Sequence, residues 1–487
     1  MKKEQKEQSN TSRRAFIKQS AIAAASFYIV PRHVLGGKGF LAPSDTLIVA
    51  AVGVGGKGQS NIDMVNKSNK AKIAYLCDVD DNRAAPTVKS FPNAKYNKDW
   101  RELFSKESKN FDAVIVSTPD HNHAVISLAA MELGKHVYVE KPLAHDIYEV
   151  RQMLASMKKH KVVAQMGNQG SSADGVRDLR EWYDAGLIGD VHTVYSWTNK
   201  PVWPQGIGWP KEKAQIPSTL DWDLWLGTAQ YRDFVDKLVP FNWRGWWDFG
   251  TGALGDMGAH LIEAPFRVLN LTHPIDVECS ETTVYTDSLK RGYFPESCPV
   301  SSTVTYTFPK TNKTAGPIKY HWMDGGLQPE RPEEIGPDER FGNGSGTLFI
   351  GTKGKMIVDS HGANASLLPY SRMKEVSVKK TLERVPGSTM GHYAQWVEAC
   401  IAGYGNKELS SPFEIACPLT ETLLIASLAL RALEIRYPAT GPQTPGSDGF
   451  VYPGRKRLIY DAGNTRITNF DTVNQYIKRE YRKGWSI

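Results

Sequence analysis

The chain has 487 residues, of which 41% are hydrophobic and 23% are charged, and its formal net charge is +7. This length and composition favour two globular domains with sizeable cores. The first 35 residues hold seven Lys or Arg and two Glu. The remainder is therefore close to neutral, which argues against nucleic acid as the main partner.

Residues 1–35 are predicted to be an export signal. Ser12, the pair Arg13-Arg14, Phe16 and Lys18 precede a short apolar run over residues 21–30. That run is too short to span a bilayer comfortably, and the pattern resembles a twin-arginine signal. The alternative is a disordered basic tail. The signal predicts a periplasmic protein without stable membrane insertion, exported in the folded state and so able to collect a cofactor first.

The next 120 residues alternate between apolar strands and helices, which predicts a parallel sheet covered on both faces. The domain is expected over residues 44–166. The predicted strands are 47–52, 73–77, 113–117, 136–139 and 162–166, and the predicted helices are 59–66, 124–133 and 147–160.

The pattern changes at residue 167, and residues 167–440 are predicted to form an α+β domain for substrate binding and oligomerisation. Its sheet is expected to be large, open and mostly antiparallel. A tail over residues 441–487 is expected to pack on the body. The predicted strands are 191–197, 276–285, 302–308, 318–322, 347–350 and 355–358, and the predicted helices are 176–185, 259–269, 392–401 and 413–433.

A glycine motif directly follows the first strand, with Gly53, Gly55 and Gly58 at the start of a helix. Such a loop lets a pyrophosphate approach the backbone and the free N–H groups of the helix. Asp78 ends the second strand, twenty residues after Gly58. A carboxylate there binds the adenosine ribose and repels a 2′-phosphate, so NAD is favoured. Arg83 lies close in sequence, and NADP therefore stays possible.

Three further segments carry candidate chemistry: residues 117–124, 139–145 and 250–263. The first two follow strands of the parallel sheet, where ligands bind in such folds, so Thr118, Pro119 and Lys141 are expected to face the cofactor. In the third segment Asp256 and His260 are four residues apart. They share one face if a helix runs from Met257 onward.

These motifs together resemble the Gfo/Idh/MocA oxidoreductase family. The resemblance rests on the glycine motif, the terminal Asp78, Thr118-Pro119 with His123, Glu140-Lys141-Pro142, and Asp256 with His260. It runs from about residue 47 to at least residue 433. It implies a Rossmann domain followed by an open-sheet domain, a cis peptide before Pro142, and a homodimer or homotetramer.

The resemblance also implies roles for single residues. Lys141 orients a substrate hydroxyl, His260 removes its proton, and Asp256 positions the substrate or the histidine. The cofactor would be held by the glycine motif and by Asp78, Trp100, Thr118, Pro119, His123, Glu140, Lys141 and Asn168. The chemistry agrees independently, because alcohol oxidation needs a base that titrates near neutral pH and a cation beside the developing alkoxide.

The cluster that ends the Trp-rich stretch is predicted to face a carbohydrate. Trp243, Arg244 and Trp246 suit stacking on a sugar ring and pairing with hydroxyls, although ordinary core packing is the alternative. No metal is predicted, because His121 and His123 have no third placed ligand. The five cysteines show no CxxC spacing.

The sequence therefore predicts an exported NAD(P)-dependent oxidoreductase acting on a sugar, glycoside or polyol, with a tightly bound cofactor. The alternative is a redox-neutral, NAD-dependent glycoside hydrolase that works by oxidation and elimination. A third possibility is a sugar-binding protein that has lost its activity.

Overall fold

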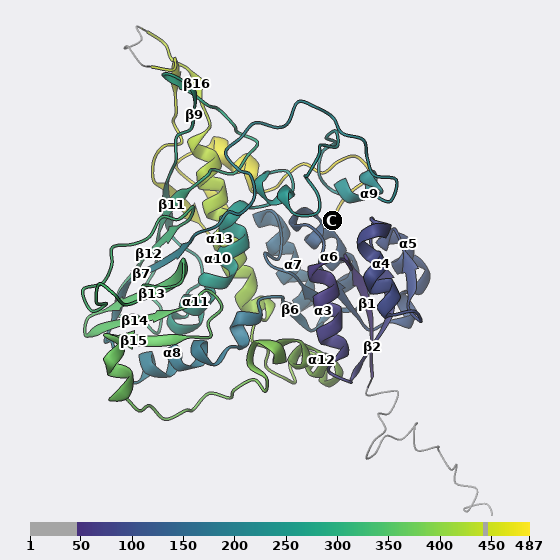
Figure 1. The fold of residues 1–487 in the computed structure, drawn as a ribbon, viewed down its shortest axis with the longest axis horizontal. Coiled ribbons are helices and arrows are strands. Elements are labelled where there is room, and N and C mark those ends of the chain that lie inside the picture. The colour runs from purple at the N-terminus through teal and green to yellow at the C-terminus, as the bar shows by residue number, and fades with distance from the viewer. Residues whose placement is uncertain (1–45, 442–446) are drawn as a thin grey trace, which may run out of the picture. The chain divides into compact units, whose positions relative to one another are not determined.

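The computed structural model describes residues 46–441 and 447–487. The predicted export signal lies outside the described residues. Residues Leu47–Ile487 pack as one unit, and the predicted succession of a Rossmann domain and an α+β domain is confirmed (Figure 1).

The first domain contains a six-stranded parallel sheet in the order β3-β2-β1-β4-β5-β6. The strand order reverses between β1 and β4, which opens a crevice at their carboxyl ends. The elements are β1 (Leu47–Val52), α3 (Lys57–Asn66), β2 (Ala71–Cys77), α4 (Asp81–Ser90), β3 (Lys95–Asn97), α5 (Trp100–Glu107), β4 (Ala113–Val116), α6 (His123–Glu132), β5 (His136–Val139), α7 (Ile147–His160) and β6 (Ala164–Met166).

The region between β2 and β4 holds three elements that the sequence pattern does not predict. Helix α4 contains Pro86, which weakens a helical pattern, yet the Asp80 side chain caps its start. Asp99 caps α5 in the same way. Strand β3 has three residues and no fully buried side chain, so it lacks an apolar signal.

The second domain contains a nine-stranded sheet in the order β15-β14-β13-β7-β12-β11-β8-β18-β19. Only β7 and β12 pair in parallel among these described strands, so the predicted mostly antiparallel sheet is confirmed. The strands are β7 (Val191–Thr198), β8 (Asp276–Glu281), β11 (Ser302–Phe308), β12 (Ile318–Met323), β13 (Ser345–Gly351), β14 (Gly354–Val358), β15 (Ala365–Leu368), β18 (Leu458–Asp461) and β19 (Arg466–Ile467). The last two strands come from the C-terminal 50 residues.

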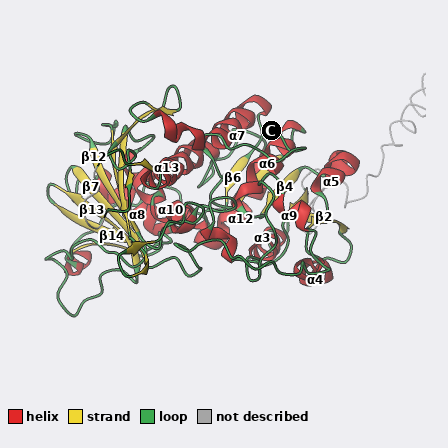
Figure 2. Ribbon diagram, turned by 90° about the horizontal axis from the view of Figure 1, so that it is seen from above, coloured by secondary structure: helices red, strands yellow, loops and turns green. Residues whose placement is uncertain are grey.

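Helices fill the space between the two sheets (Figure 2). Helix α13 (Phe413–Leu433) contacts α7, α10 and β8, and so belongs to both domains. It is long and apolar enough to cross a membrane by length and composition, but most of its residues are buried inside the fold. The other helices are α8 (Asp174–Asp184), α10 (Gly252–Leu261), α11 (Glu263–Leu269) and α12 (His392–Ala402).

The helix that carries Asp256 and His260 begins earlier than predicted. Helix α10 starts at Gly252 and ends at Leu261, and α11 follows as a separate helix. The glycines of this segment have low helix propensity, but close packing needs one of them. A Cβ on Gly258 would lie 2.5 Å from the Leu423 side chain of α13. Tertiary packing therefore overrides local preference here.

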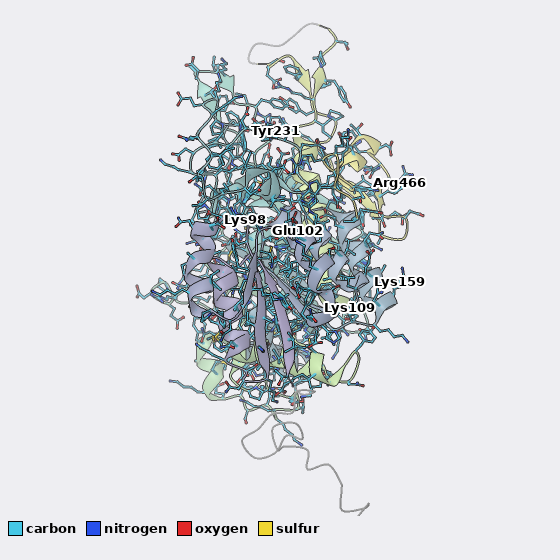
Figure 3. The ribbon with its side chains drawn as sticks, turned by 90° about the vertical axis from the view of Figure 1, so that its right-hand side faces the viewer. Lys98, Glu102, Lys109, Lys159, Tyr231 and Arg466 are labelled. Atoms are coloured by element: carbon cyan, nitrogen blue, oxygen red, sulfur yellow. The ribbon has the colours of Figure 1, made fainter. Side chains whose placement is uncertain are left out.

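Residues 217–243, which we call the strap, run from the second domain across the edge of the parallel sheet. The strap contains the short helix α9 (Trp222–Leu226) and packs around its own aromatic cluster. Within this cluster Trp222 and Trp225 stack with ring centroids 4.7 Å apart. The strap is attached to the end of β2. Asp221 N donates to Val79 O (2.9 Å), and Asp81 N donates to Thr219 O (3.1 Å). Figure 3 shows Lys98, which donates to Thr219 O at 3.2 Å, with Tyr231 of the strap beyond it.

Residues 477–487, which we call the tail, hold the strap from behind, and Figure 1 marks the C-terminus beside α9. Arg482 donates to Asp223 O (2.8 Å) and Gly227 O (3.2 Å). Trp485 lies against Trp100 of the first domain, with ring centroids 6.3 Å apart. The tail thus connects the strap to α5.

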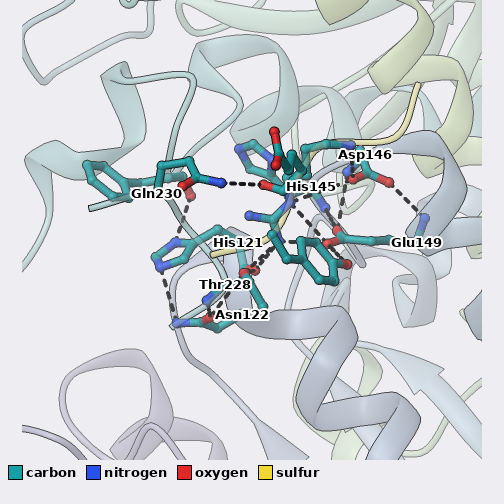
Figure 4. A network of polar contacts seen from close by, with 11 residues as sticks. His121, Asn122, His145, Asp146, Glu149, Thr228 and Gln230 are labelled. Atoms are coloured by element: carbon teal, nitrogen blue, oxygen red, sulfur yellow. Dashed lines mark hydrogen bonds and ion pairs between the residues drawn. The ribbon is translucent and has the colours of Figure 1, made fainter. Parts of the chain in front are cut away.

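A buried polar network anchors the tail at its other end (Figure 4). The Arg479 guanidinium donates to Glu149 (2.6 Å), to His121 O (2.5 Å) and to Thr228 Oγ1 (2.7 Å). Burial lowers the pKa of the His121 side chain to about 3, so the ring is neutral and has one N–H donor. Its Nδ1 donates to Phe249 O (3.2 Å), and its Nε2 accepts a hydrogen bond from the Asn122 side-chain amide (3.1 Å). The network fixes the loop that leads into α6.

Candidate active site

A cavity of about 630 Å³ lies at the carboxyl ends of the parallel strands. Its walls come from both domains. The first domain contributes the loops after β1, β2, β4 and β5, and the second contributes α10, the loop after β14, the strap and the residues that follow it. A cleft of this size and mixed lining is typical of a cofactor or substrate site.

The glycine loop forms one end of this cavity, and each predicted glycine has a different task. Gly53 has φ +78°, and a Cβ there would lie 2.6 Å from Ser117 O. Gly55 lines the cavity. Gly58 lies behind the loop, where a Cβ would lie 1.9 Å from Gly53 O. Gly58 therefore permits helix–strand packing and does not itself contact the cavity.

Asp78 lines the cavity and also braces the loop. One carboxylate oxygen accepts hydrogen bonds from Val54 N (2.8 Å) and Gly55 N (3.2 Å), and the other accepts one from Asp80 N (3.1 Å). Burial raises the pKa of Asp78. Arg83 lies over the loop, since its Nη2 is 2.6 Å from where a Cβ on Gly56 would stand. A carboxylate and a guanidinium thus both face the adenosine end.

Two loops of the first domain are tied together beside the glycine loop. Thr118 and Pro119 line the cavity, and the Thr118 hydroxyl is buried with no hydrogen-bond partner among the described residues. The two ring nitrogens of His123 lie 2.7 Å from Thr118 O and 2.7 Å from Pro142 O. The Lys141–Pro142 peptide is cis. His123 thus connects the two loops, while the free Thr118 hydroxyl is available to a ligand.

Glu140 lies in the cavity wall between a hydrogen-bond donor, Asn61, and a cationic side chain, Lys57. Asn61 donates to its carboxylate at 2.9 Å, and Lys57 Nζ lies 3.8 Å away. Lys57 also donates to Tyr393 Oη at 3.2 Å. Both Glu140 and Lys57 line the cavity between the glycine loop and Lys141.

Lys141 forms a largely buried ion pair with Asp256. Its Nζ lies 2.6 Å from Asp256 Oδ1 and donates to Asp256 O at 2.9 Å. Burial alone would raise the pKa of Asp256, but Lys141 and Arg244 outweigh it and lower that pKa well below its usual range. An ammonium group has three hydrogens, so one remains for a ligand oxygen.

His260 is held as a neutral base by its surroundings. Asn168 donates its amide hydrogen to Ala259 O (2.7 Å), which turns its carbonyl oxygen towards His260 Nδ1 (2.8 Å). Nδ1 is therefore the protonated nitrogen, and Nε2 is left as an acceptor. Burial lowers the pKa of His260 well below its ordinary value, and Lys141 lowers it further. Asn168 was predicted to contact the cofactor; it lies fully buried behind His260 instead.

The predicted carbohydrate-facing residues divide into two groups. Trp243 and Arg244 line the cavity, with the guanidinium 4.5 Å from the Trp243 ring centroid. Arg244 Nε is buried with no hydrogen-bond partner among the described residues. Trp246 packs against Trp209 in the aromatic cluster of the strap, with ring centroids 4.7 Å apart. Trp100 lines the adenosine end, as the cofactor prediction requires.

Other residues of the wall are not predicted from the sequence. Phe241 and Asp120 come from segments where a side chain's direction cannot be read from the pattern, and Lys57 is hidden inside the glycine motif. His361 is a lone histidine in the loop after β14 and carries no sequence signal. Its ring lies 5.1 Å from that of His260.

The cavity fits a dinucleotide by its own features. The glycine loop leaves the start of α3 without side chains on the cavity side at Gly53 and Gly55, and helix N-termini favour phosphate groups. Asp78 suits ribose hydroxyls. The unpartnered Thr118 hydroxyl suits a polar group of the ligand.

Comparison with known families agrees with this reading. Residues 47–168 match the family model described as oxidoreductase family, NAD-binding Rossmann fold, and residues 176–291 match the C-terminal alpha/beta domain of the same family. Both models describe the Gfo/Idh/MocA oxidoreductase family, so residues 47–168 and 176–291 are similar to the two domains of that family. The first domain of this chain is accordingly an NAD-binding Rossmann domain.

Individual relatives match over part of their length. An inositol 2-dehydrogenase/D-chiro-inositol 3-dehydrogenase of Lacticaseibacillus casei is 31% identical over 144 residues, which is 29% of this chain and 41% of the relative. A glycosyl hydrolase family 109 protein of Shewanella putrefaciens is 31% identical over 135 residues, 25% of this chain and 28% of that protein. The chain spans about two-fifths of the length of the first curated relatives that it matches.

Among solved structures, levoglucosan dehydrogenase in complex with NADH and levoglucosan superposes with a TM-score of 0.53. The superposition covers 79% of this chain and 98% of that chain at 15% identity. At that identity the likeness shows the shared fold alone.

Substitution of Asn168 is expected to change the pH dependence of catalysis through His260. In Asn168→Asp a carboxylate beside Nδ1 favours the imidazolium and so raises the pKa of His260. Because the base must be neutral, the acid limb of the kcat/KM profile should move to higher pH. In Asn168→Ala, Nδ1 loses its acceptor, and kcat/KM should fall about 10²-fold.

The exposed variant Asn406→Ala serves as the control and should leave the profile in place. ¹⁵N NMR of the histidine rings should show Nδ1 protonated in the wild type and a mixture of tautomers in Asn168→Ala. An unshifted profile in the Asp variant would contradict the role of Asn168.

Proposed function

We propose that the protein oxidises a secondary alcohol of a sugar, glycoside or polyol with NAD as hydride acceptor. The observation that carries this proposal is the grouping of Lys141 and a neutral His260 in one wall of the dinucleotide cavity. A cation and a base at one site are what the removal of a hydroxyl proton requires.

In this reaction the cavity residues would bind the cofactor, accept the hydroxyl proton and stabilise the developing charge. The glycine loop, Asp78 and Thr118 hold the cofactor, which accepts a hydride at its nicotinamide when bound. His260 Nε2 takes the hydroxyl proton of the substrate. The third hydrogen on Lys141 Nζ donates a hydrogen bond to the same substrate oxygen and stabilises its developing negative charge. Asp256 keeps Lys141 in place. The products are a carbonyl, the reduced cofactor and one proton on His260.

A carbohydrate substrate is supported by the part of the cavity wall that Trp243 and Arg244 form. The Trp243 ring and the adjacent Arg244 offer an apolar face beside an unpartnered N–H donor. C–H-rich sugar faces pack on aromatic rings, and hydroxyls accept from guanidinium groups. The names of relatives, an inositol dehydrogenase and a levoglucosan dehydrogenase, point to the same class of substrate.

The decisive measurement uses purified protein with its retained nucleotide and no added cofactor. Addition of glucosides, galactosides, free sugars or inositols should raise the near-ultraviolet absorbance of reduced nicotinamide to about one equivalent per chain for the right substrate. In Lys141→Met and His260→Gln the rate of this rise should fall by about 10²-fold or more.

Lys159→Met, which removes an exposed lysine of α7, is the matched control and should react like the wild type. Full-rate reduction in Lys141→Met would contradict the assigned roles. Flat absorbance combined with release of reducing sugar from a glycoside would favour the redox-neutral hydrolase. The hydrolase alternative is retained because one relative is named a glycosyl hydrolase family 109 protein.

We further propose that the cofactor stays bound between turnovers because the strap closes the adenosine end of the cavity. Leu220, Leu224 and Trp225 of the strap line the same cavity as Asp78. The strap is bonded to residues 79–81, directly after that carboxylate in the chain. Bound nucleotide then leaves only when these contacts open. A retained cofactor requires a second sugar or another acceptor to reoxidise it.

Weakening the tail should therefore speed cofactor release. In Arg482→Ala and in Trp485→Ala we expect NAD to dissociate about tenfold faster, because each variant removes about 1–2 kcal/mol of contacts that hold the strap closed. The measurement is the nucleotide lost during gel filtration and after dilution. Reduction of the bound cofactor in the first turnover should be unchanged.

Arg457→Ala, which breaks an exposed ion pair with Glu278, is the control and should retain NAD like the wild type. Equal release rates in all four proteins would show that the tail does not govern retention.

Export to the periplasm is proposed from the N-terminal pattern alone. The pair Arg13-Arg14 with Phe16 and Lys18 supports a twin-arginine signal. Replacement of both arginines by lysine should leave the protein in the cytoplasm, as measured by cell fractionation. Unchanged periplasmic accumulation would reject this route. The homodimer or homotetramer stays a prediction.

A further inference from the structure

His361 enters the active-site cavity from the second domain. It lies in the loop between β14 and β15, lines the cavity, and its ring is 5.1 Å from the His260 ring at an interplanar angle of 35°. The residue is exposed to solvent, whereas His260 sits deeper in the wall. His361 is therefore placed between the base and the solvent.

The loop that carries His361 is held firmly by its own backbone. Asp359 accepts hydrogen bonds from the N–H groups of His361 (3.1 Å), Ala363 (2.9 Å) and Asn364 (3.1 Å). The loop also packs on glycines of the facing segment. A Cβ on Gly170 would lie 2.8 Å from His361 O, and one on Gly175 would lie 2.4 Å from Gly362 O. The position of the ring thus follows from a fixed backbone.

The proton that His260 gains has few places to go. Nδ1 of His260 is committed to Asn168, so the proton arrives and leaves at Nε2. The charged groups that act on His260 are Lys141, Asp256 and Lys57, besides His361. Lysine ammonium groups have no acceptor site. Asp256 is a poor acceptor, because Lys141 and Arg244 lower its pKa against the effect of burial. An imidazole, in contrast, accepts and donates protons near neutral pH.

We propose that His361 carries the proton between His260 and solvent. The step moves no electrons. Because the ring centroids are 5.1 Å apart, the His260 imidazolium gives its Nε2 proton to His361 through one intervening water. The His361 imidazolium then gives a proton to the solvent. His361 Nδ1 bonds Ser360 Oγ at 2.9 Å, which leaves Nε2 for the transfer. The proposal rests on the proposed function, since the proton originates in the substrate hydroxyl.

The test compares two signals in one turnover of the NAD-retaining protein with the responding sugar. Absorbance follows cofactor reduction, and a pH-indicator dye in weak buffer follows proton release. In the wild type the two signals should coincide. In His361→Gln proton release should lag behind reduction about tenfold or more, and added imidazole should restore coincidence.

His192→Gln, which removes an exposed histidine of β7, is the matched control and should behave like the wild type. If His361→Gln folds poorly, His361→Asn provides the same comparison with a smaller side chain. Coincident signals in the His361 variants would overturn the proposal. Absence of any reduction signal in the wild type would instead reject the proposed function.

A second readout needs no turnover. His361 is one of the charges that lower the pKa of His260. ¹⁵N NMR titration should therefore show a higher His260 pKa in His361→Gln than in the wild type, and an unchanged value in His192→Gln. An unchanged His260 pKa in His361→Gln would show that the two rings do not communicate.

Discussion

The ion pair between Lys141 and Asp256 is the contact on which the candidate site depends. Lys141 stands at the end of β5 in the first domain and Asp256 on α10 in the second, so this pair joins the two domains at the cavity. Their side chains are 11% and 13% exposed. Removing one partner of such a pair leaves an uncompensated buried charge and costs about 3–5 kcal/mol. Arg244 lies 3.4 Å from Asp256 and 3.5 Å from Asp120, and so extends the pair along the cavity wall.

The same pair sets the properties of the base. A lysine beside a histidine disfavours the imidazolium, so His260 stays neutral and ready to accept a proton. Without Asp256 the lysine would repel any cationic form of the histidine even more strongly, and proton uptake would become harder. Asn168 adds the geometric part by fixing which nitrogen accepts. Charge and geometry are thus supplied by different residues.

The sequence predicts the architecture well because strand–helix alternation and the glycine motif are local patterns. Lys141, Asp256 and His260 are found for the same reason, since each follows a strand or shares a helix face. Asn168 and Trp246 are misplaced because the pattern does not tell whether a side chain points into a cavity or behind its wall. Helix α10 begins early because glycines that weaken a helix in isolation allow it to pack on α13. His361 is missed because its place in the site depends on how two domains meet, which no local pattern encodes.

The proposed closure of the cavity by the strap and the position of His361 concern two different requirements: retention of the nucleotide and exchange of protons with solvent. In the proposed function, a strap bonded beside Asp78 would keep the bulky nucleotide in place, and the tail ties that strap to both domains. A cavity closed in this way must still exchange small species with solvent. The substrate reaches the wall formed by Trp243 and Arg244, while protons need only a titratable group at the surface. His361, which is exposed and comes from a loop of the second sheet, is proposed to supply such a group beside His260. Nucleotide retention and proton exchange can therefore coexist, since the proposal assigns them to different residues of the cavity wall.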